Sequence, residues 1–159
     1  MADVLTIGAF GWDEAAFFDA LAQARVGLFC DIRRRRGVRG AEYAFVNSAR
    51  LQSRLQQLGI PYTHRLDLAP SEHVRRVQAE ADAREGIAKR SRSRLGDAFI
   101  AAYSAEHLAA FDARAFLDDT ASTRPVCLFC VERAPAACHR SLLAAALERA
   151  GATVEHLIP

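Results

Sequence analysis

Reactive side chains gather around the end of one apolar run near the C-terminus. The run, residues 126–131, is rich in strand-forming residues. The reactive groups at its end and in the loop that follows are Cys130, Glu132, Cys138, His139 and Arg140. Thiols can act as nucleophiles, carboxylates and imidazoles as acids or bases, and guanidinium groups as anion ligands. The sequence therefore predicts a chemical site in this loop, with the first four residues as catalytic candidates and Arg140 as a substrate ligand.

The segment Cys138–Arg140 lies where a helix is predicted to begin and to run to Ala150. Unpaired backbone N–H groups and the positive end of the helix dipole stabilise a thiolate or a bound anion there. Arg140 is unfavourable in the first helical turn unless an anion lies beside it. We expect this anion to be the Glu132 carboxylate or a ligand phosphate.

A second group of charged residues follows the apolar run at 26–32. The chain has 159 residues and a formal net charge of +2, but residues 25–65 hold nine arginines against Asp31 and Glu42. Guanidinium groups pair bidentately with phosphate or carboxylate oxygens, so the Arg-rich segment 33–39 predicts an anion-recruiting loop in which Arg33 and Arg34 bind substrate. The alternative is a solvated surface that reflects an arginine-rich composition, since Lys89 is the one lysine.

Strands and helices alternate along the chain. Apolar runs predict strands at 4–9, 26–32, 60–64, 124–131 and 152–158, and helical spacing is found within 13–24, 47–58, 71–84, 95–117 and 138–150. Residues 85–94 are expected to form a mobile basic connection. This alternation predicts a three-layer α/β fold with a mostly parallel sheet of about five strands, in one domain that spans residues 1–159.

Ligands of such sheets bind beyond the carboxyl ends of the strands. This rule brings Asp31 and Arg33 toward Cys130 and Glu132 if their two strands are neighbours. Gly8 ends the first strand and would let backbone approach the same crevice. Asp31 is then a further acid/base candidate, or it braces the crevice through an ion pair with Arg33 or Arg140.

The cysteines favour reduced thiols. The chain shows no secretory signal and no apolar stretch long enough to span a bilayer, so we expect a cytoplasmic protein without a membrane partner. Cys30 and Cys127 are expected to be small buried hydrophobic residues. Cys130, Cys138 and His139 could instead bind a metal with His64 or His156 as a fourth donor.

The motifs are similar to those of the domain-of-unknown-function family 488. The matching segments are Thr6-Ile7-Gly8, Asp31-Ile32-Arg33, Leu68-Ala69-Pro70, Val154-Glu155-His156-Leu157, and Cys130-x-Glu132 followed by Cys138-His139-Arg140. The resemblance covers nearly the whole chain and implies a fold and a site, without a reaction. Two departures stand out: Ala9 and Phe10 replace the histidine or aromatic residue that often follows Thr-Ile-Gly, and the run Arg33–Arg36 exceeds the usual basic content.

Three functions fit these observations. The first is an enzyme that acts on a phosphate-bearing substrate, a nucleotide or nucleic acid, with Cys130 or Cys138 as nucleophile. The second is a non-catalytic nucleic-acid-binding or interaction module that uses the segments 33–39 and 84–94. The third is a metal-binding protein. The sequence names no cofactor.

Overall fold

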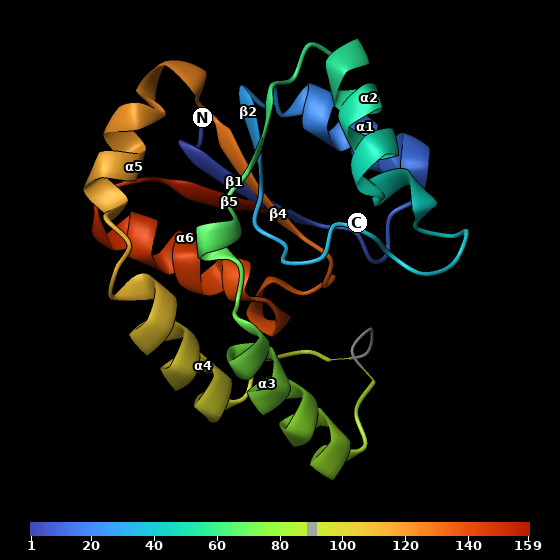
Figure 1. Cartoon of the computed structure of the whole chain (residues 1–159). Helices are drawn as coiled ribbons and strands as arrows, with labels where there is room; N and C mark the ends of the chain where they lie inside the picture. The colour runs from blue at the N-terminus through green and yellow to red at the C-terminus, as the bar shows by residue number, and fades with distance from the viewer. Residues whose placement is uncertain (89–91) are drawn as a thin grey trace.

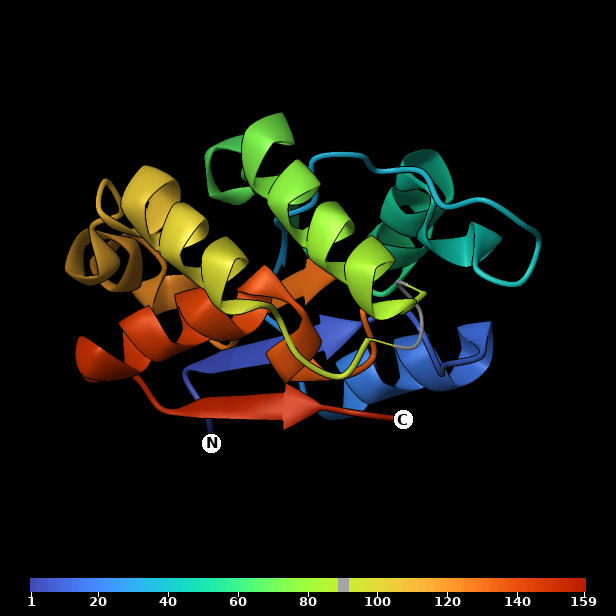
Figure 2. The same cartoon turned by 90° about the horizontal axis from the view of Figure 1, so that it is seen from below.

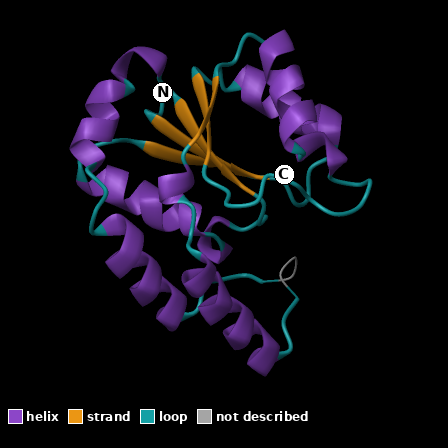
Figure 3. Ribbon diagram, in the orientation of Figure 1, coloured by secondary structure: helices purple, strands orange, loops and turns teal. Residues whose placement is uncertain are grey.

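Five parallel strands form the centre of the molecule (Figure 3). The structure is a computed structural model that describes residues 1–88 and 92–159. The strands are β1 (Val4–Gly8), β2 (Leu28–Asp31), β3 (Tyr62–His64), β4 (Val126–Cys130) and β5 (Val154–Leu157). They lie in the order β3-β2-β4-β1-β5, and all pairings are parallel. The predicted α/β class and its parallel sheet are confirmed.

Helices cover both faces of this sheet (Figure 1). On one face lie α1 (Glu14–Gln23) and α2 (Ser48–Gln57), and on the other lie α5 (Ala113–Asp119) and α6 (His139–Arg149). Outside α6, α3 (Glu72–Glu85) and α4 (Asp97–Tyr103) lie side by side (Figure 2). Short 3-10 turns occupy Ala44–Val46, Leu66–Leu68, Ala121–Thr123 and Pro135–Ala137, and a π turn occupies Ser104–Leu108.

Two apolar layers hold the sheet between the helices. Phe17 of α1 packs with Phe29 and Phe129 on one face, and Leu128 packs with Leu143 of α6 on the other. Since both faces are covered, every residue of β1 and β4 is buried. This burial explains why the sequence shows continuous apolar runs at these strands instead of alternation.

The middle of the chain differs from the prediction. The helical spacing within 95–117 is divided between α4, the π turn and α5. The connection expected at 85–94 begins later, because Glu85 still belongs to α3, and its residues 89–91 lie outside the described residues. Arg92 is held by buried ion pairs and is not a solvated part of this connection.

The order of the strands places the predicted site. β2 and β4 are direct neighbours, with Asp31 opposite Phe129, and Gly8 of β1 lies opposite Cys130. The carboxyl ends of β1, β2 and β4 therefore meet at one edge of the sheet. Among the helices that the structure describes, none has the length and apolar character needed to cross a membrane.

Candidate functional site

A cleft of about 580 Å³ lies at this edge of the sheet. Its walls come from the loop after β2, from α3, and from the segment that joins β4 to α6. The predicted site residues that line it are Arg33, Arg34, Cys130, Glu132, Cys138 and His139. Asp31, Arg140 and Gly8 are not among the lining residues. Six of the nine predicted side chains thus meet in one cleft.

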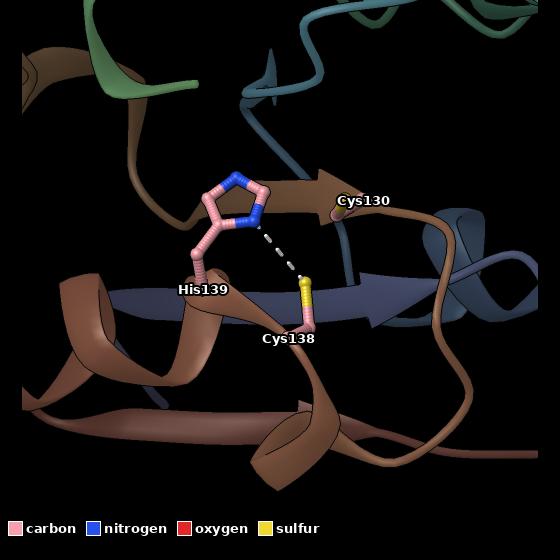
Figure 4. A group of neighbouring side chains, drawn as sticks. All are labelled: Cys130, Cys138 and His139. Carbon is pink, nitrogen blue, oxygen red and sulfur yellow. Dashed lines mark hydrogen bonds between the residues drawn. The ribbon is translucent and has the colours of Figure 1, made fainter. Parts of the chain in front are cut away.

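Cys138 and His139 form a contact pair in this cleft (Figure 4). The Cys138 Sγ lies 3.7 Å from the His139 Nδ1 and, as the N-cap of α6, accepts a hydrogen bond from the Arg140 backbone N–H at 3.5 Å. The His139 Nε2 lies 2.9 Å from the Ile32 carbonyl oxygen. Because a carbonyl only accepts, Nε2 carries a proton, and Nδ1 is the ring atom that faces the sulfur.

The surroundings of this pair favour its charged form. Burial by itself would raise the pKa of the Cys138 thiol, but a hydrogen bond from Cys130 and the charges of His139 and Arg140 hold this pKa well below its ordinary value. Burial would likewise lower the pKa of His139, but the Cys138 sulfur and the Ile32 carbonyl raise it. Both directions describe a thiolate beside an imidazolium.

Cys130 completes a compact group of donors. Its sulfur, the Cys138 sulfur and a ring nitrogen of His139 all lie within 4.8 Å of one another, and all three residues are buried. Thiolate and imidazole are typical zinc ligands, so these are the residues that could hold a metal. Neither His64 nor His156, our expected fourth donors, belongs to this group among the described residues. The His64 ring contacts the Arg33 carbonyl and the His156 ring contacts the Thr6 hydroxyl, both at 2.7 Å.

Asp31 and Arg33 form a buried bidentate ion pair. The Arg33 Nε and Nη2 donate to the Asp31 carboxylate at 2.9 and 2.8 Å, and the Tyr62 hydroxyl donates to the same carboxylate at 2.7 Å. Arg33 also donates to the Val46 carbonyl and lies over the Phe129 ring. We expected Asp31 to be an acid/base residue or to brace the crevice through an ion pair, and the structure contains the ion pair with Arg33.

Glu132 has a different cation from the one we expected. Its carboxylate lies 3.0 Å from Arg92, which also contacts Asp82 at 2.6 Å and the Ala137 carbonyl at 3.2 Å. Among the described residues, neither Arg33 nor Arg140 forms the side-chain ion pair that we expected with Glu132. Arg92 thereby ties α3 to the loop after β4. The sequence suggested only that Arg92 belonged to a basic segment.

Arg140 and Gly8 determine how the loop after β4 packs against the sheet. The buried Arg140 guanidinium donates to the carbonyls of Glu132 and Arg133 at 2.7 and 3.1 Å. A Cβ on Gly8 would collide with the Glu132 carbonyl, so the absence of a side chain lets this loop cross β1. Among the described residues, Arg140 thus has neutral backbone carbonyls as acceptors where we expected the Glu132 carboxylate.

The outer walls of the cleft are strongly basic. Seven arginines line it against three acidic residues. They come from the loop after β2, from α3 and from the segment before α4, and they are Arg33, Arg34, Arg35, Arg39, Arg75, Arg76 and Arg92. Sequence reasoning missed Arg75 and Arg76, two adjacent cations near the start of α3.

The fold and the cleft together define an α/β protein with a buried Cys–His cluster at the strand ends, under an arginine-lined opening. The chain belongs to the family described as Domain of unknown function DUF488, whose model matches residues 14–147. The family inferred from the motifs is therefore confirmed. Comparison with curated proteins and with solved structures gave no significant match.

Proposed function

We propose that the protein is a cysteine-dependent enzyme that acts on a phosphate-bearing substrate, a nucleotide or nucleic acid. The observation that carries the proposal is the Cys138–His139 contact of 3.7 Å within an arginine-lined cleft. A thiolate is the reactive form of cysteine, and an adjacent imidazolium stabilises it. The cationic walls match a substrate with negative charge.

The proposed roles follow from the contacts. Cys138 is the nucleophile, and His139 stabilises its thiolate and exchanges a proton at Nδ1. The arginines on the outer walls hold the anionic part of the substrate. Since the Glu132 carboxylate already pairs with Arg92, we assign it to positioning Arg92 and not to acid/base work. Asp31 orients Arg33 in the same way.

Protection of Cys138 by anionic ligands tests this proposal. Iodoacetamide should alkylate Cys138, and ATP or a short oligonucleotide should slow the reaction, whereas an uncharged nucleoside should not. An Arg75→Ala/Arg76→Ala variant should need roughly thirtyfold more ATP for the same protection, since each of the two lost charge-assisted contacts costs on the order of 1 kcal/mol. The matched control is Arg84→Ala, an exposed arginine of α3 that does not line the cleft. Protection that is the same in all variants would contradict the anion-binding role of the walls.

A non-catalytic nucleic-acid-binding module is the second candidate. It is favoured by the exposure of Arg35, a cleft-lining arginine whose side chain is 71% exposed. Such a module should bind single-stranded DNA or RNA with an affinity that falls steeply with salt, and Cys138→Ser should bind as well as the parent. Nucleotide turnover that Cys138→Ser abolishes would favour the enzyme instead.

Elemental analysis tests the third candidate, a metal site. Stoichiometric zinc or iron in the purified protein, lost in Cys130→Ser, would assign the three donors to a metal and withdraw the nucleophile role of Cys138.

A further inference from the structure

We infer that Cys130 and Cys138 act together as a two-thiol redox pair, and that the cleft reduces disulfide bonds in substrates that carry anionic groups. The inference rests on the function proposed above and names the chemical class of its substrate: a disulfide with phosphate or carboxylate substituents. In a mechanism that uses Cys138 alone, Cys130 would only stabilise the Cys138 thiolate, whereas a second thiol beside a reactive one can also react with it.

The arrangement of the two cysteines supports this pairing. Cys130 ends β4 and Cys138 caps α6, so both stand at the same edge of the sheet, and both line the cleft (Figure 4). Their sulfurs lie within 4.8 Å of one another. The residues between them form a loop with one short 3-10 turn, Pro135–Ala137. Side-chain rotation within this loop would bring the sulfurs toward the disulfide bond length of about 2 Å.

The chemistry of a second thiol selects the kind of substrate. Attack on phosphorus or on a carbonyl carbon needs one nucleophile, and water can release the adduct. When the adduct is a mixed disulfide, a neighbouring thiol releases it by thiol–disulfide exchange. A reactive cysteine with a second thiol within 4.8 Å is therefore suited to sulfur–sulfur bonds.

The proposed reaction has two steps. The Cys138 thiolate attacks one sulfur of the substrate, a Cys138–substrate disulfide forms, the substrate's own S–S bond breaks, and the first thiol leaves with the proton of the His139 imidazolium. His139, now neutral, takes the proton of Cys130, whose sulfur attacks the Cys138 sulfur. The Cys130–Cys138 disulfide forms, and the second thiol leaves with that proton. The substrate gains two electrons from the cysteine pair and two protons, one from the His139 imidazolium and one from Cys130. A small cellular thiol or dithiol then reduces the disulfide and returns both protons.

An anionic aromatic disulfide is a direct probe of this reaction. Dithiobis(nitrobenzoate) carries two carboxylates and releases coloured thionitrobenzoate when its disulfide is cleaved. One equivalent of this reagent should release two equivalents of thionitrobenzoate from the wild type, and the protein should become lighter by two hydrogen atoms. Cys130→Ser should release one equivalent and retain the mixed disulfide on Cys138. Cys138→Ser should lose the fast release, about a hundredfold or more in rate.

Controls separate this reaction from general thiol reactivity. Cys30→Ala removes a thiol that is buried outside the cleft and should behave as the wild type. Circular dichroism verifies the fold of each variant. Arg75→Ala/Arg76→Ala should slow the reaction with dithiobis(nitrobenzoate) several-fold more than it slows the reaction with dithiodipyridine, an uncharged aromatic disulfide.

Two results would overturn the inference. One is a Cys130→Ser variant that still releases two equivalents of thionitrobenzoate. The other is a Cys138→Ser variant that releases one equivalent and keeps the mixed disulfide, while Cys130→Ser loses the fast release. If Cys138 is nevertheless alkylated and ATP protects it, the proposed enzyme remains and only the redox pairing fails. If Cys138 reacts with none of these reagents, both proposals fail.

Discussion

The four cysteines form two pairs in contrasting surroundings. Cys30 and Cys127 lie on neighbouring strands inside the apolar layers, whereas Cys130 and Cys138 pack against one of these layers and also line the cleft. All four are free thiols with little or no exposed surface. Burial raises the pKa of Cys30 to about 12 and raises the pKa of Cys127 even further, whereas the pKa of Cys138 lies well below its ordinary value.

Burial alone therefore does not decide the pKa of these thiols, because the groups around each sulfur can outweigh it. Cys138 has a hydrogen-bonding thiol, an imidazole and a helix N-terminus around its sulfur. Cys127 experiences the charge of Arg140 as well, but burial outweighs this charge. The comparison teaches that a buried cysteine becomes a nucleophile when several favourable groups converge on its sulfur.

The largest expected effect is a difference in alkylation rate between the two pairs. In the native protein at neutral pH, iodoacetamide should modify Cys138 roughly a thousandfold faster than Cys127, because Cys127 reacts only when the core opens, which costs several kcal/mol. Mass spectrometry of the labelled peptides over time measures both rates in one sample. Equal rates would remove the distinction between cleft and core.

Arg140→Met should cost about 3 kcal/mol of unfolding free energy, because the buried Glu132 carbonyl and the partly buried Arg133 carbonyl lose their donor. Urea denaturation measures this loss. Arg149→Met, at an exposed position of the same helix, is the matched control and should stay within about 0.5 kcal/mol. Similar values for the two variants would mean that Arg140 does not support the floor of the cleft.

The pH dependence of alkylation tests the role of His139. Since the pKa of Cys138 is lowered, its thiolate persists as the pH falls below the ordinary thiol range. His139→Gln removes the imidazolium and should shift this pKa upward, so the alkylation rate should fall about tenfold at pH 6.5 and stay nearly unchanged at pH 9.5. A pH–rate profile that is parallel in both proteins would contradict the pairing of the two side chains.

The smallest effect is expected in the core. Cys127→Ala removes a fully buried sulfur and should lower the unfolding free energy by about 1 kcal/mol. Its Cys138 alkylation profile should match that of the wild type. A shifted profile would show that core and cleft are coupled.

Much of the architecture could be predicted from the sequence. The apolar runs at β1, β2 and β4 reflect strands buried on both faces, and a parallel sheet brings their ends together. Cys130, Cys138 and His139 were grouped correctly because strand ends and helix starts are marked by local pattern. Helical spacing could not locate the π turn at Ser104–Leu108, since such a turn depends on packing.

The partners of the charged residues could not be predicted in the same way. Glu132 had several arginines within plausible reach, and the choice of Arg92 depends on how α3 packs against α4 and α6. Asp31 and Arg140 looked like site residues, but both are fully buried and bind other parts of the protein. Ion pairs can join residues that are far apart in the chain, so the sequence is equally compatible with many different partners.

The sequence alone determined the strands, the helices and the residue types at their ends, because these follow from local periodicity, capping and turn chemistry. Only the tertiary structure decided which thiols line the cleft and which lie in the core, and which carboxylate each buried arginine pairs with. These outcomes depend on distances between segments far apart in the chain, and such distances are fixed only when the two apolar layers close around the sheet.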